Sequence, residues 1–145
     1  MPEIYRTQEV LMSQNELYQL VADVENYPKF LPWCNSVLVI EKTPTVIIAE
    51  LDCDLRGIPI EFTTRNKNTC PESIEISLIK GPFKTLNAIW TFKALGEKKC
   101  KVEFRISWQM ANFILEKTTG VIFNQLSQKI FDSFVRKAYE TRRYD

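Results

Sequence analysis

The longest regular pattern of hydrophobic and polar residues lies at the C-terminal end of the chain. From about Asn112 to Arg142, apolar residues recur at steps of three and four, the spacing of one stripe along an α-helix. The stripe is formed by Leu115, Thr119, Ile122, Phe123, Leu126, Ile130, Phe134 and Ala138, and it is widened by Val121, Phe131 and Val135. The pattern predicts one helix about 45 Å long, with Gly120 as a weak point near its first turns. A stripe of this length needs a large apolar surface to cover it.

The residues before this helix alternate between apolar and polar positions, which is the period of β-strands with one buried face. A short helix is expected at Gln14–Val24, begun by a capping box of Ser13 and Glu16. We expect about seven strands, at residues 3–11, 37–41, 46–56, 58–67, 73–80, 85–94 and 100–110. Their connections are short and their outer faces are charged. The sequence therefore predicts an α+β fold, a single domain over residues 1–145 in which one curved antiparallel sheet wraps around the long C-terminal helix.

The composition narrows the range of functions. The formal net charge is +1 over 145 residues, so there is no bulk electrostatic case for binding DNA or an acidic membrane. The sequence contains no histidine, which removes the commonest general base and the commonest metal ligand. We therefore expect a protein that is not an enzyme. Glu50, Asp52 and Asp54 resemble a group of carboxylates, but they alternate on the outer face of a strand and are interpreted as solvated side chains.

The cysteines and the N-terminus indicate a cellular location. Four cysteines show no CxxC spacing, so we expect reduced thiols rather than disulfides or a zinc site. The first residues are polar and of mixed charge, without the apolar region of a signal peptide. No apolar run approaches the roughly 18 residues that span a bilayer. These features predict a cytoplasmic protein.

Large aromatic residues gather on the predicted inner face of the sheet. They are Phe62, Trp90, Phe92, Phe104 and Trp108, and the helix adds Phe123 and Phe134. Two interpretations are open: an apolar space that binds a ligand between sheet and helix, or a solid core. Arg65 also has two interpretations. It bonds a polar ligand head at the rim of a cavity, or it pairs with a carboxylate such as Glu61 or Glu75 on the outer face.

Four segments resemble the coenzyme Q-binding and ribosome association toxin family. This family belongs to the START-like superfamily, which also carries the name polyketide cyclase/dehydrase. The segments are Val24–Cys34, Phe62–Asn66, Gly81–Phe92 and Phe134–Tyr139. The first looks like the hallmark of the family. The others are similar to its F-x-[ST]-R-N strand end, its G-P-F-[KR]-x-L-x-x-x-W-x-F run and its closing F-x-x-R-A. Ala88 departs from a frequent glycine, and Lys137 adds a cation beside Arg136.

The resemblance implies a helix-grip fold with a long apolar cavity. Mitochondrial members of the family bind ubiquinone and support respiration. A bacterial branch, which this chain resembles, is described as a toxin that binds the large ribosomal subunit and blocks subunit joining. We expect a lipid-binding protein that holds ubiquinone or a similar isoprenoid lipid and requires no cofactor, with the toxin activity as the alternative. Transient contact with the inner membrane is expected, and an enzyme of the cyclase kind is disfavoured.

The two activities predict different functional residues. The expected cavity lining is Tyr27, Pro28, Phe30, Phe62, Phe83, Trp90, Phe104, Trp108, Phe123, Leu126 and Ile130. Phe83, which follows Pro82 at the start of a strand, is expected to act as a gate. The expected ribosome-facing residues are Lys98, Lys99 and Lys101 near a hairpin, with a second cluster of Arg136, Lys137, Arg142 and Arg143 at the C-terminus. Both clusters are also typical of ordinary solvated faces.

Overall fold

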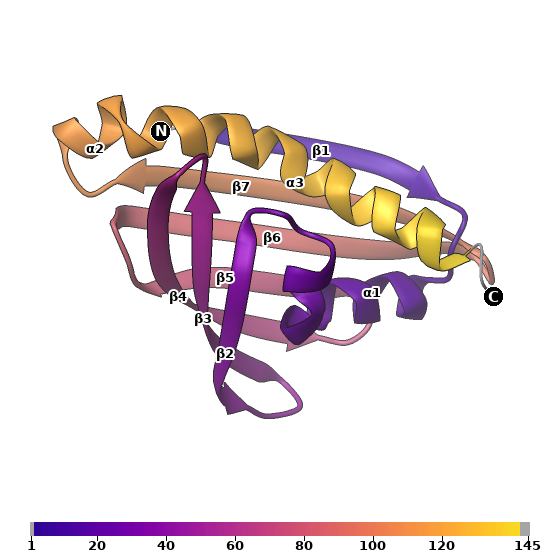
Figure 1. Cartoon of the computed structure of the whole chain (residues 1–145). Coiled ribbons are helices and arrows are strands. Elements are labelled where there is room, and N and C mark those ends of the chain that lie inside the picture. The colour runs from indigo at the N-terminus through magenta and orange to yellow at the C-terminus, as the bar shows by residue number, and fades with distance from the viewer. Residues whose placement is uncertain (1, 143–145) are drawn as a thin grey trace.

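The computed structural model describes residues 2–142 and contains a seven-stranded antiparallel sheet with one long helix across its inner face (Figure 1). The strands are β1 (Glu3–Val10), β2 (Cys34–Lys42), β3 (Val46–Leu55), β4 (Ile58–Thr69), β5 (Ser73–Lys80), β6 (Phe83–Gly96) and β7 (Lys99–Met110). The helices are α1 (Gln14–Ala22), the 3-10 helix η1 (Val24–Lys29), α2 (Phe113–Lys117) and α3 (Thr119–Arg142). The predicted α+β fold and its seven strands are confirmed.

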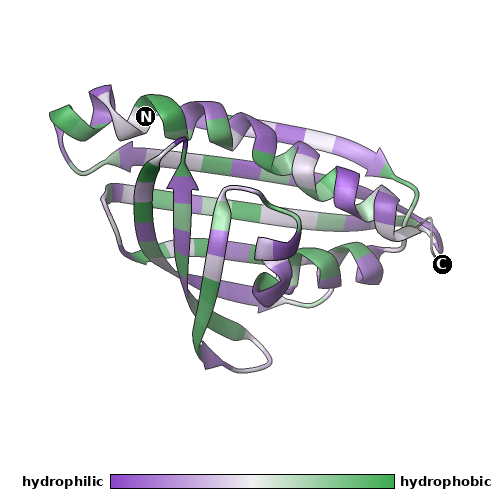
Figure 2. Ribbon diagram, viewed as in Figure 1, coloured by the Kyte–Doolittle hydropathy of each residue, from purple (hydrophilic) through white to green (hydrophobic). Residues whose placement is uncertain are grey.

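The sheet is curved so that its apolar face turns toward α3. The strands lie in the order β1-β7-β6-β5-β4-β3-β2 across the sheet. Strands β2 to β6 each pair with the next strand in the chain, and β1 pairs with β7. In Figure 1, β2, β3 and β4 run steeply across the direction of β6 and β7. Hydrophobic and hydrophilic residues alternate along the strands (Figure 2), as one-sided burial requires. On the inner face Trp90 lies opposite Phe104, and Leu86 lies opposite Trp108.

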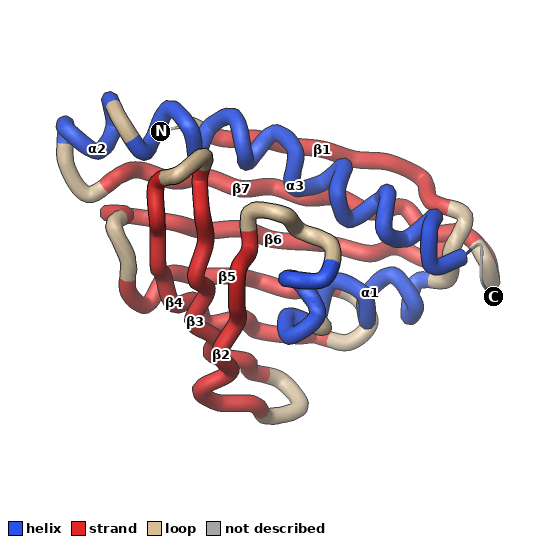
Figure 3. Tube along the Cα trace, in the orientation of Figure 1, coloured by secondary structure: helices blue, strands red, loops and turns tan. Residues whose placement is uncertain are grey.

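The expected single C-terminal helix is wrong, because the structure divides it into α2 and α3 at Thr118 (Figure 3). The backbone of Thr118 is not helical, with φ −111° and ψ −91°. The Glu116 carboxylate accepts a hydrogen bond of 2.9 Å from the backbone N–H of Met110, which ties α2 to the end of β7. A Cβ on Gly120 would lie 3.1 Å from the Leu115 carbonyl oxygen and 3.1 Å from Met110 Cγ. The glycine therefore allows α3 to begin close against α2 and β7.

The predicted stripe is buried or half-buried except at one residue. Phe123, Phe131, Phe134, Val135 and Ala138 are buried, whereas Leu115, Ile122, Leu126 and Ile130 are half-buried. Val121, which was expected to widen the stripe, is 51% exposed. Its position beside Gly120, at the start of the rotated helix, turns it toward solvent. The helix is therefore covered over a narrower arc at its beginning than at its end.

The first helix begins as the sequence predicts. Ser13 Oγ accepts a hydrogen bond of 3.2 Å from the backbone N–H of Glu16, so Ser13 is the N-cap as predicted, while the Glu16 carboxylate accepts a bond of 2.8 Å from the Ser13 hydroxyl. The helix α1 ends at Ala22, two residues earlier than expected, and the chain continues as η1 with Pro28 inside it. This short 3-10 turn leads directly into the loop that carries Trp33.

The four cysteines are free thiols; Cys34, Cys53 and Cys100 are buried and Cys70 is exposed. Within residues 2–142, no group of three or more cysteine and acidic side chains is placed to hold a metal ion. None of the helices in this range is long and apolar enough to cross a membrane.

Candidate functional site

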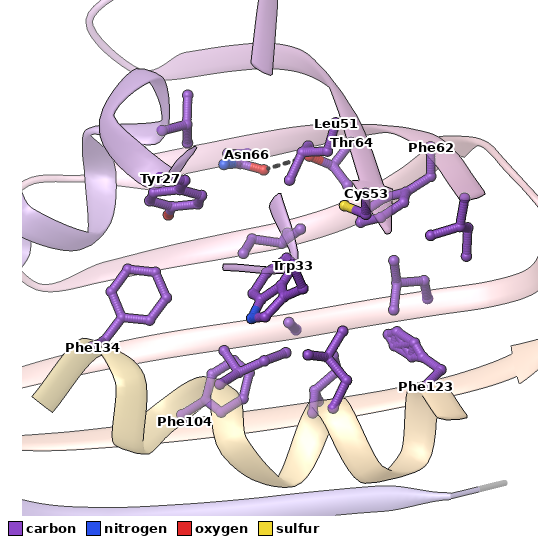
Figure 4. A pocket seen from close by; sticks show the side chains of 18 of the residues that line it. Tyr27, Trp33, Leu51, Cys53, Phe62, Thr64, Asn66, Phe104, Phe123 and Phe134 are labelled. Carbon is purple, nitrogen blue, oxygen red and sulfur yellow. Dashed lines mark hydrogen bonds between the residues drawn. The ribbon is translucent and has the colours of Figure 1, made fainter. Parts of the chain in front are cut away.

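An inner cavity of about 100 Å³ lies between α3 and the inner face of the sheet (Figure 4). Its wall is formed by side chains from β3 to β7, by η1, and by the loop residue Trp33. Nearly all of this wall is apolar. The polar atoms that line the cavity belong to Tyr27, Trp33, Cys53, Thr64 and Asn66. Such a concave, apolar space with a few polar groups is the usual form of a site for a hydrophobic ligand.

Seven of the eleven residues expected to line the cavity do so: Tyr27, Phe62, Trp90, Phe104, Phe123, Leu126 and Ile130. The other four do not reach it. Phe83 and Trp108 lie behind the Phe123 ring, with centroid distances of 5.0 and 5.1 Å. Phe30 packs against the Phe134 ring at 5.3 Å and faces outward, and Pro28 lies inside η1. Phe83 is buried at the start of β6, and its role as a gate stays a prediction.

The sequence analysis missed thirteen residues of the wall: Val24, Trp33, Leu51, Cys53, Leu55, Ile60, Thr64, Asn66, Ile76, Leu86, Ala88, Ile106 and Phe134. Thr64 and Asn66 are the informative ones, because both are buried and polar. Thr64 Oγ1 donates a hydrogen bond of 3.1 Å to Asn66 Oδ1 (Figure 4). The sequence could have predicted both, because side chains two residues apart on a strand share a face, and Thr64 and Asn66 therefore point inward with Phe62.

The same period of two places Arg65 on the outer face, as one of its two interpretations has it, so the other interpretation, a position at the cavity rim, is wrong. Arg65 is exposed and lines a shallow hollow on the outer face together with Glu75, Ser77 and Arg105. The Ser77 hydroxyl donates a hydrogen bond of 3.4 Å to the Arg65 carbonyl oxygen. In the described part of the chain Arg65 forms no ion pair, so the alternative pairing with Glu61 or Glu75 is not present either.

Tyr27 is held at the cavity wall by its polar end. Its hydroxyl donates a hydrogen bond to the backbone carbonyl of Val21, and its ring packs edge-on against Phe134 at 5.2 Å. Burial raises the pKa of the hydroxyl above its ordinary value, and the nearby Asp23 and Cys34 raise it further. The hydroxyl is therefore neutral, and its proton is already donated to Val21.

Two thiols face each other beside Trp33. Cys34 and Cys53 are direct partners in the β2–β3 ladder. Because the Cys34 N–H donates to Leu31 and the Asp54 N–H donates to Trp33, the pair occupies a non-hydrogen-bonded position, where facing side chains lie closest. A hydrogen bond between the thiols lowers the pKa of Cys34 and raises that of Cys53. Only Cys53 of this pair reaches the cavity wall.

Trp33 and Leu126 separate the inner cavity from two grooves on the surface. The outer groove is lined by these two residues with Phe30, Pro32, Lys129, Asp132, Ser133, Arg136, Lys137 and Glu140. The turn groove is lined by them with Pro32, Asp54, Leu55, Arg56, Ile122, Gln125 and Lys129. Both grooves share a wall with the cavity at Trp33 and Leu126, so these side chains form part of the barrier between the cavity and the solvent.

The predicted ribosome-facing lysines are paired with carboxylates. Lys98 lies 3.6 Å from Glu16, Lys99 lies 3.8 Å from Glu9, and Lys101 lies 3.7 Å from Glu103. These exposed pairs reduce the positive potential of the hairpin. In the second cluster, Arg136 and Lys137 line the outer groove beside Lys129, and Lys137 Nζ lies 5.7 Å from the centroid of the Phe30 ring. Arg142 ends α3, and Arg143 lies outside the described residues.

Comparisons with known proteins agree on one family. The family model for "polyketide cyclase / dehydrase and lipid transport" matches residues 11–135. The ribosome association toxin RatA of Escherichia coli K12 is 39% identical over 140 residues, covering 97% of this chain and 89% of RatA. The mitochondrial coenzyme Q-binding protein COQ10 homolog B of Xenopus laevis is 24% identical over 130 residues, covering 87% of this chain and 53% of that protein.

Solved structures show the same fold at low identity. A START superfamily protein from Mycobacterium smegmatis matches with a TM-score of 0.80 and 15% identity, covering 96% of this chain and 98% of that one. The Streptomyces aromatase/cyclase Zhui matches with a TM-score of 0.82 and 14% identity, covering 99% and 96%. These likenesses confirm the START-like, helix-grip architecture.

Proposed function

The chain belongs to the polyketide cyclase/dehydrase and lipid transport family, and we propose that within it the chain binds an apolar lipid of the ubiquinone kind. The observation that carries this proposal is the apolar cavity between the sheet and α3. Each CH₂ group that a lipid buries there contributes about 0.8 kcal/mol, so an isoprenoid tail gains affinity without many polar contacts. The bound quinone would support respiratory electron transport, and the chain itself would need no cofactor and perform no catalysis.

The cavity must widen to accept such a ligand. A dry protein cavity of about 150 Å³ holds one benzene molecule, which is larger than the about 100 Å³ available here. The residues that close the cavity toward the surface include Trp33, which comes from a loop, and Leu126, which is half-buried. Movement of α3 at its joint with α2, together with the Trp33 side chain, would open the space toward both grooves. The ligand would then enter between Trp33 and Leu126.

Organic extraction of the purified protein tests the proposal. The extract is analysed by mass spectrometry against a mock purification, and we expect an isoprenoid quinone near one equivalent. Phe123→Asp places a charge in the cavity wall and should abolish retention in a folded protein. The matched control is Val121→Asp on the exposed side of the same helix, which should retain the lipid. An empty extract together with failure to take up added quinone contradicts the proposal, as does full retention by folded Phe123→Asp.

Binding to the large ribosomal subunit is the second candidate function, because relatives 39% identical carry the name ribosome association toxin. Since Lys98 and Lys99 are ion-paired, the cations along α3, Arg136 and Lys137, offer the stronger contact with RNA phosphates. Co-sedimentation with isolated large subunits compares the two surfaces. We expect Arg136→Glu with Lys137→Glu to weaken co-sedimentation more than Lys98→Glu with Lys99→Glu. No loss with either double variant would remove both clusters from this candidate function.

Both candidate functions fit a bacterial cytoplasmic protein. Lipid exchange would add transient contact with the inner membrane, whereas ribosome binding would not need it. The two functions use different parts of the molecule, the interior and the surface of α3, so a single chain is able to perform both.

A further inference from the structure

Trp33 is held by its backbone at the wall of the cavity, where its side chain also borders the two surface grooves. Its carbonyl oxygen accepts a hydrogen bond of 2.9 Å from the Asp54 N–H of β3. The flanking residue Leu31 is fully buried, and its N–H donates a bond of 2.9 Å to the Tyr27 carbonyl oxygen. Figure 4 shows the indole between the sheet and α3, with its nitrogen on the side of the helix.

The indole nitrogen of Trp33 has no hydrogen-bond partner in the described part of the chain, although the atom is buried. A buried tryptophan N–H normally finds a partner, and leaving it without one costs free energy. An indole is a donor only, so the missing partner must be an acceptor. Within the described residues, no acceptor of the wall lies within hydrogen-bond distance of this nitrogen. A water molecule needs two to four polar partners and would find too few in this apolar surrounding.

We propose that the Trp33 indole N–H donates a hydrogen bond to an acceptor oxygen on the head of the bound lipid, a ring carbonyl or an ether oxygen. This inference rests on the proposed function and deepens it, because it places the head group beside Trp33. Trp33 and Leu126 also border both surface grooves, so the head would sit just inside the entrance. A quinone ring suits this position, since its polar atoms are acceptors and it carries no donor that would need a partner.

The proposal makes Trp33 a specificity-determining residue. A lipid whose head carries an acceptor oxygen satisfies the indole N–H, whereas a plain hydrocarbon of the same length leaves it unpaired. Apolar contacts with the wall are similar for both ligands. The hydrogen bond therefore sets the preference between them, and removing the N–H while keeping an aromatic ring should remove that preference.

The test titrates wild-type protein and Trp33→Phe with two probes, using isothermal titration calorimetry. One probe is a ubiquinone with two isoprene units, and the other is the same prenyl chain without its ring. We expect Trp33→Phe to raise the Kd for the quinone about tenfold and to leave the Kd for the hydrocarbon unchanged. An equal change for both probes would mean that Trp33 acts by packing alone. An unchanged quinone Kd would also overturn the proposal.

A second measurement does not depend on the variant folding. In wild-type protein labelled with ¹⁵N-tryptophan, the indole N–H resonance of Trp33 should move downfield when the quinone binds and stay in place with the hydrocarbon. No shift on quinone binding contradicts the proposal. If wild-type protein binds neither probe, the proposed lipid-binding function fails, and the role of Trp33 fails with it. If it binds the quinone without a shift and without sensitivity to Trp33→Phe, only the inference about Trp33 fails.

Discussion

The two halves of α3 carry one continuous apolar stripe but pack in different ways. In the C-terminal half, Phe131, Phe134, Val135 and Ala138 are all buried. The Trp90 ring lies 5.9 Å from Phe131 and 5.1 Å from Phe134, so this half packs on an aromatic cluster, of which Trp90 and Phe134 also line the cavity. In the N-terminal half Phe123 is buried, but Ile122, Leu126 and Ile130 are only half-buried, and Phe123, Leu126 and Ile130 line the cavity.

The difference shows how the fold holds a cavity open beside a well-packed core. Beneath the C-terminal half, β6 and β7 present the large rings of Trp90 and Phe104, whose centroids lie 4.4 Å apart. Beneath the N-terminal half, the rings of Phe83 and Trp108 contact Phe123, and β3 and β4 add smaller side chains such as Cys53 and Thr64 to the cavity wall. We call the C-terminal half, whose stripe is more completely buried, the anchoring half, and the N-terminal half, which carries three of the four helix residues of the cavity wall, the covering half. The end with fewer buried contacts is also the one expected to move more easily.

The largest expected effect comes from the anchoring half. Phe134→Ala removes a ring that contacts Trp90, Tyr27 and Phe30, and we expect it to lower the free energy of unfolding by about 3–5 kcal/mol. Urea denaturation followed by circular dichroism measures the loss. The control is Phe113→Ala on α2, which is 74% exposed and should change stability by less than about 0.5 kcal/mol. A loss below about 1 kcal/mol for Phe134→Ala would contradict the anchoring role.

The second-largest expected effect on stability concerns Gly81, in the turn between β5 and β6. Gly81 has φ +157°, and a Cβ there would lie 2.7 Å from Phe62 Cβ, which is too close. Gly81→Ala should push the Phe62 strand away and lower the free energy of unfolding by about 1–3 kcal/mol. Gly96→Ala is the control, because nothing lies within 4 Å of its added methyl group. Equal stability of the two variants would show that the β5–β6 turn absorbs the methyl group without displacing the cavity wall.

Patterns that leave a direct mark on the sequence predicted the fold well. One-sided burial is visible in the sequence as the alternation along the strands and as the stripe on α3. The N-cap of α1 is visible as Ser13 with Glu16 three residues later. The break at Thr118 left only Gly120 as a mark, because its position also depends on the hydrogen bond from the Met110 N–H to the Glu116 carboxylate. Local spacing reports which face is buried but does not report tertiary contacts that rotate one helix segment relative to the next.

The same limit of local spacing explains which residues of the cavity wall the sequence analysis found and which it missed. Alternation correctly placed Phe62 and Phe104 on the inner face, but it could not tell the cavity wall from the layer behind it, where Trp108 lies. Asn66 was within reach of the same reasoning, because it shares the period of Phe62. The direction of the Trp33 side chain was not within reach of this reasoning. Trp33 lies in a loop that follows two prolines and precedes a strand, and a loop has no period that indicates where a side chain points.

A pH dependence tests the contact between η1 and the anchoring half. Burial keeps the pKa of Tyr27 above its ordinary value of about 10. Below pH 10 the hydroxyl is neutral in the folded and in the unfolded chain, so it adds no pH dependence to the free energy of unfolding. Above pH 10 the unfolded chain releases this proton while the folded chain keeps it, and stability should fall by about 1.4 kcal/mol per pH unit. The measurement is urea denaturation between pH 9 and about 11, compared with Tyr27→Phe, in which this slope should be missing. Identical slopes in the two proteins would show that Tyr27 is not shielded.

The smallest expected effect on stability comes from the covering half and completes the comparison. Leu126 is half-buried, so Leu126→Ala should lower the free energy of unfolding by about 1 kcal/mol, less than the 2–5 kcal/mol of a fully buried leucine. Because Leu126 and Trp33 form part of the barrier between the cavity and both grooves, the same variant should take up quinone several-fold faster. Stopped-flow tryptophan fluorescence with a short-chain ubiquinone measures the rate, and Val121→Ala on the exposed side of α3 serves as the control. If Leu126→Ala costs as much stability as Phe134→Ala, or leaves the uptake rate unchanged, the two halves of α3 do not divide anchoring and covering between them.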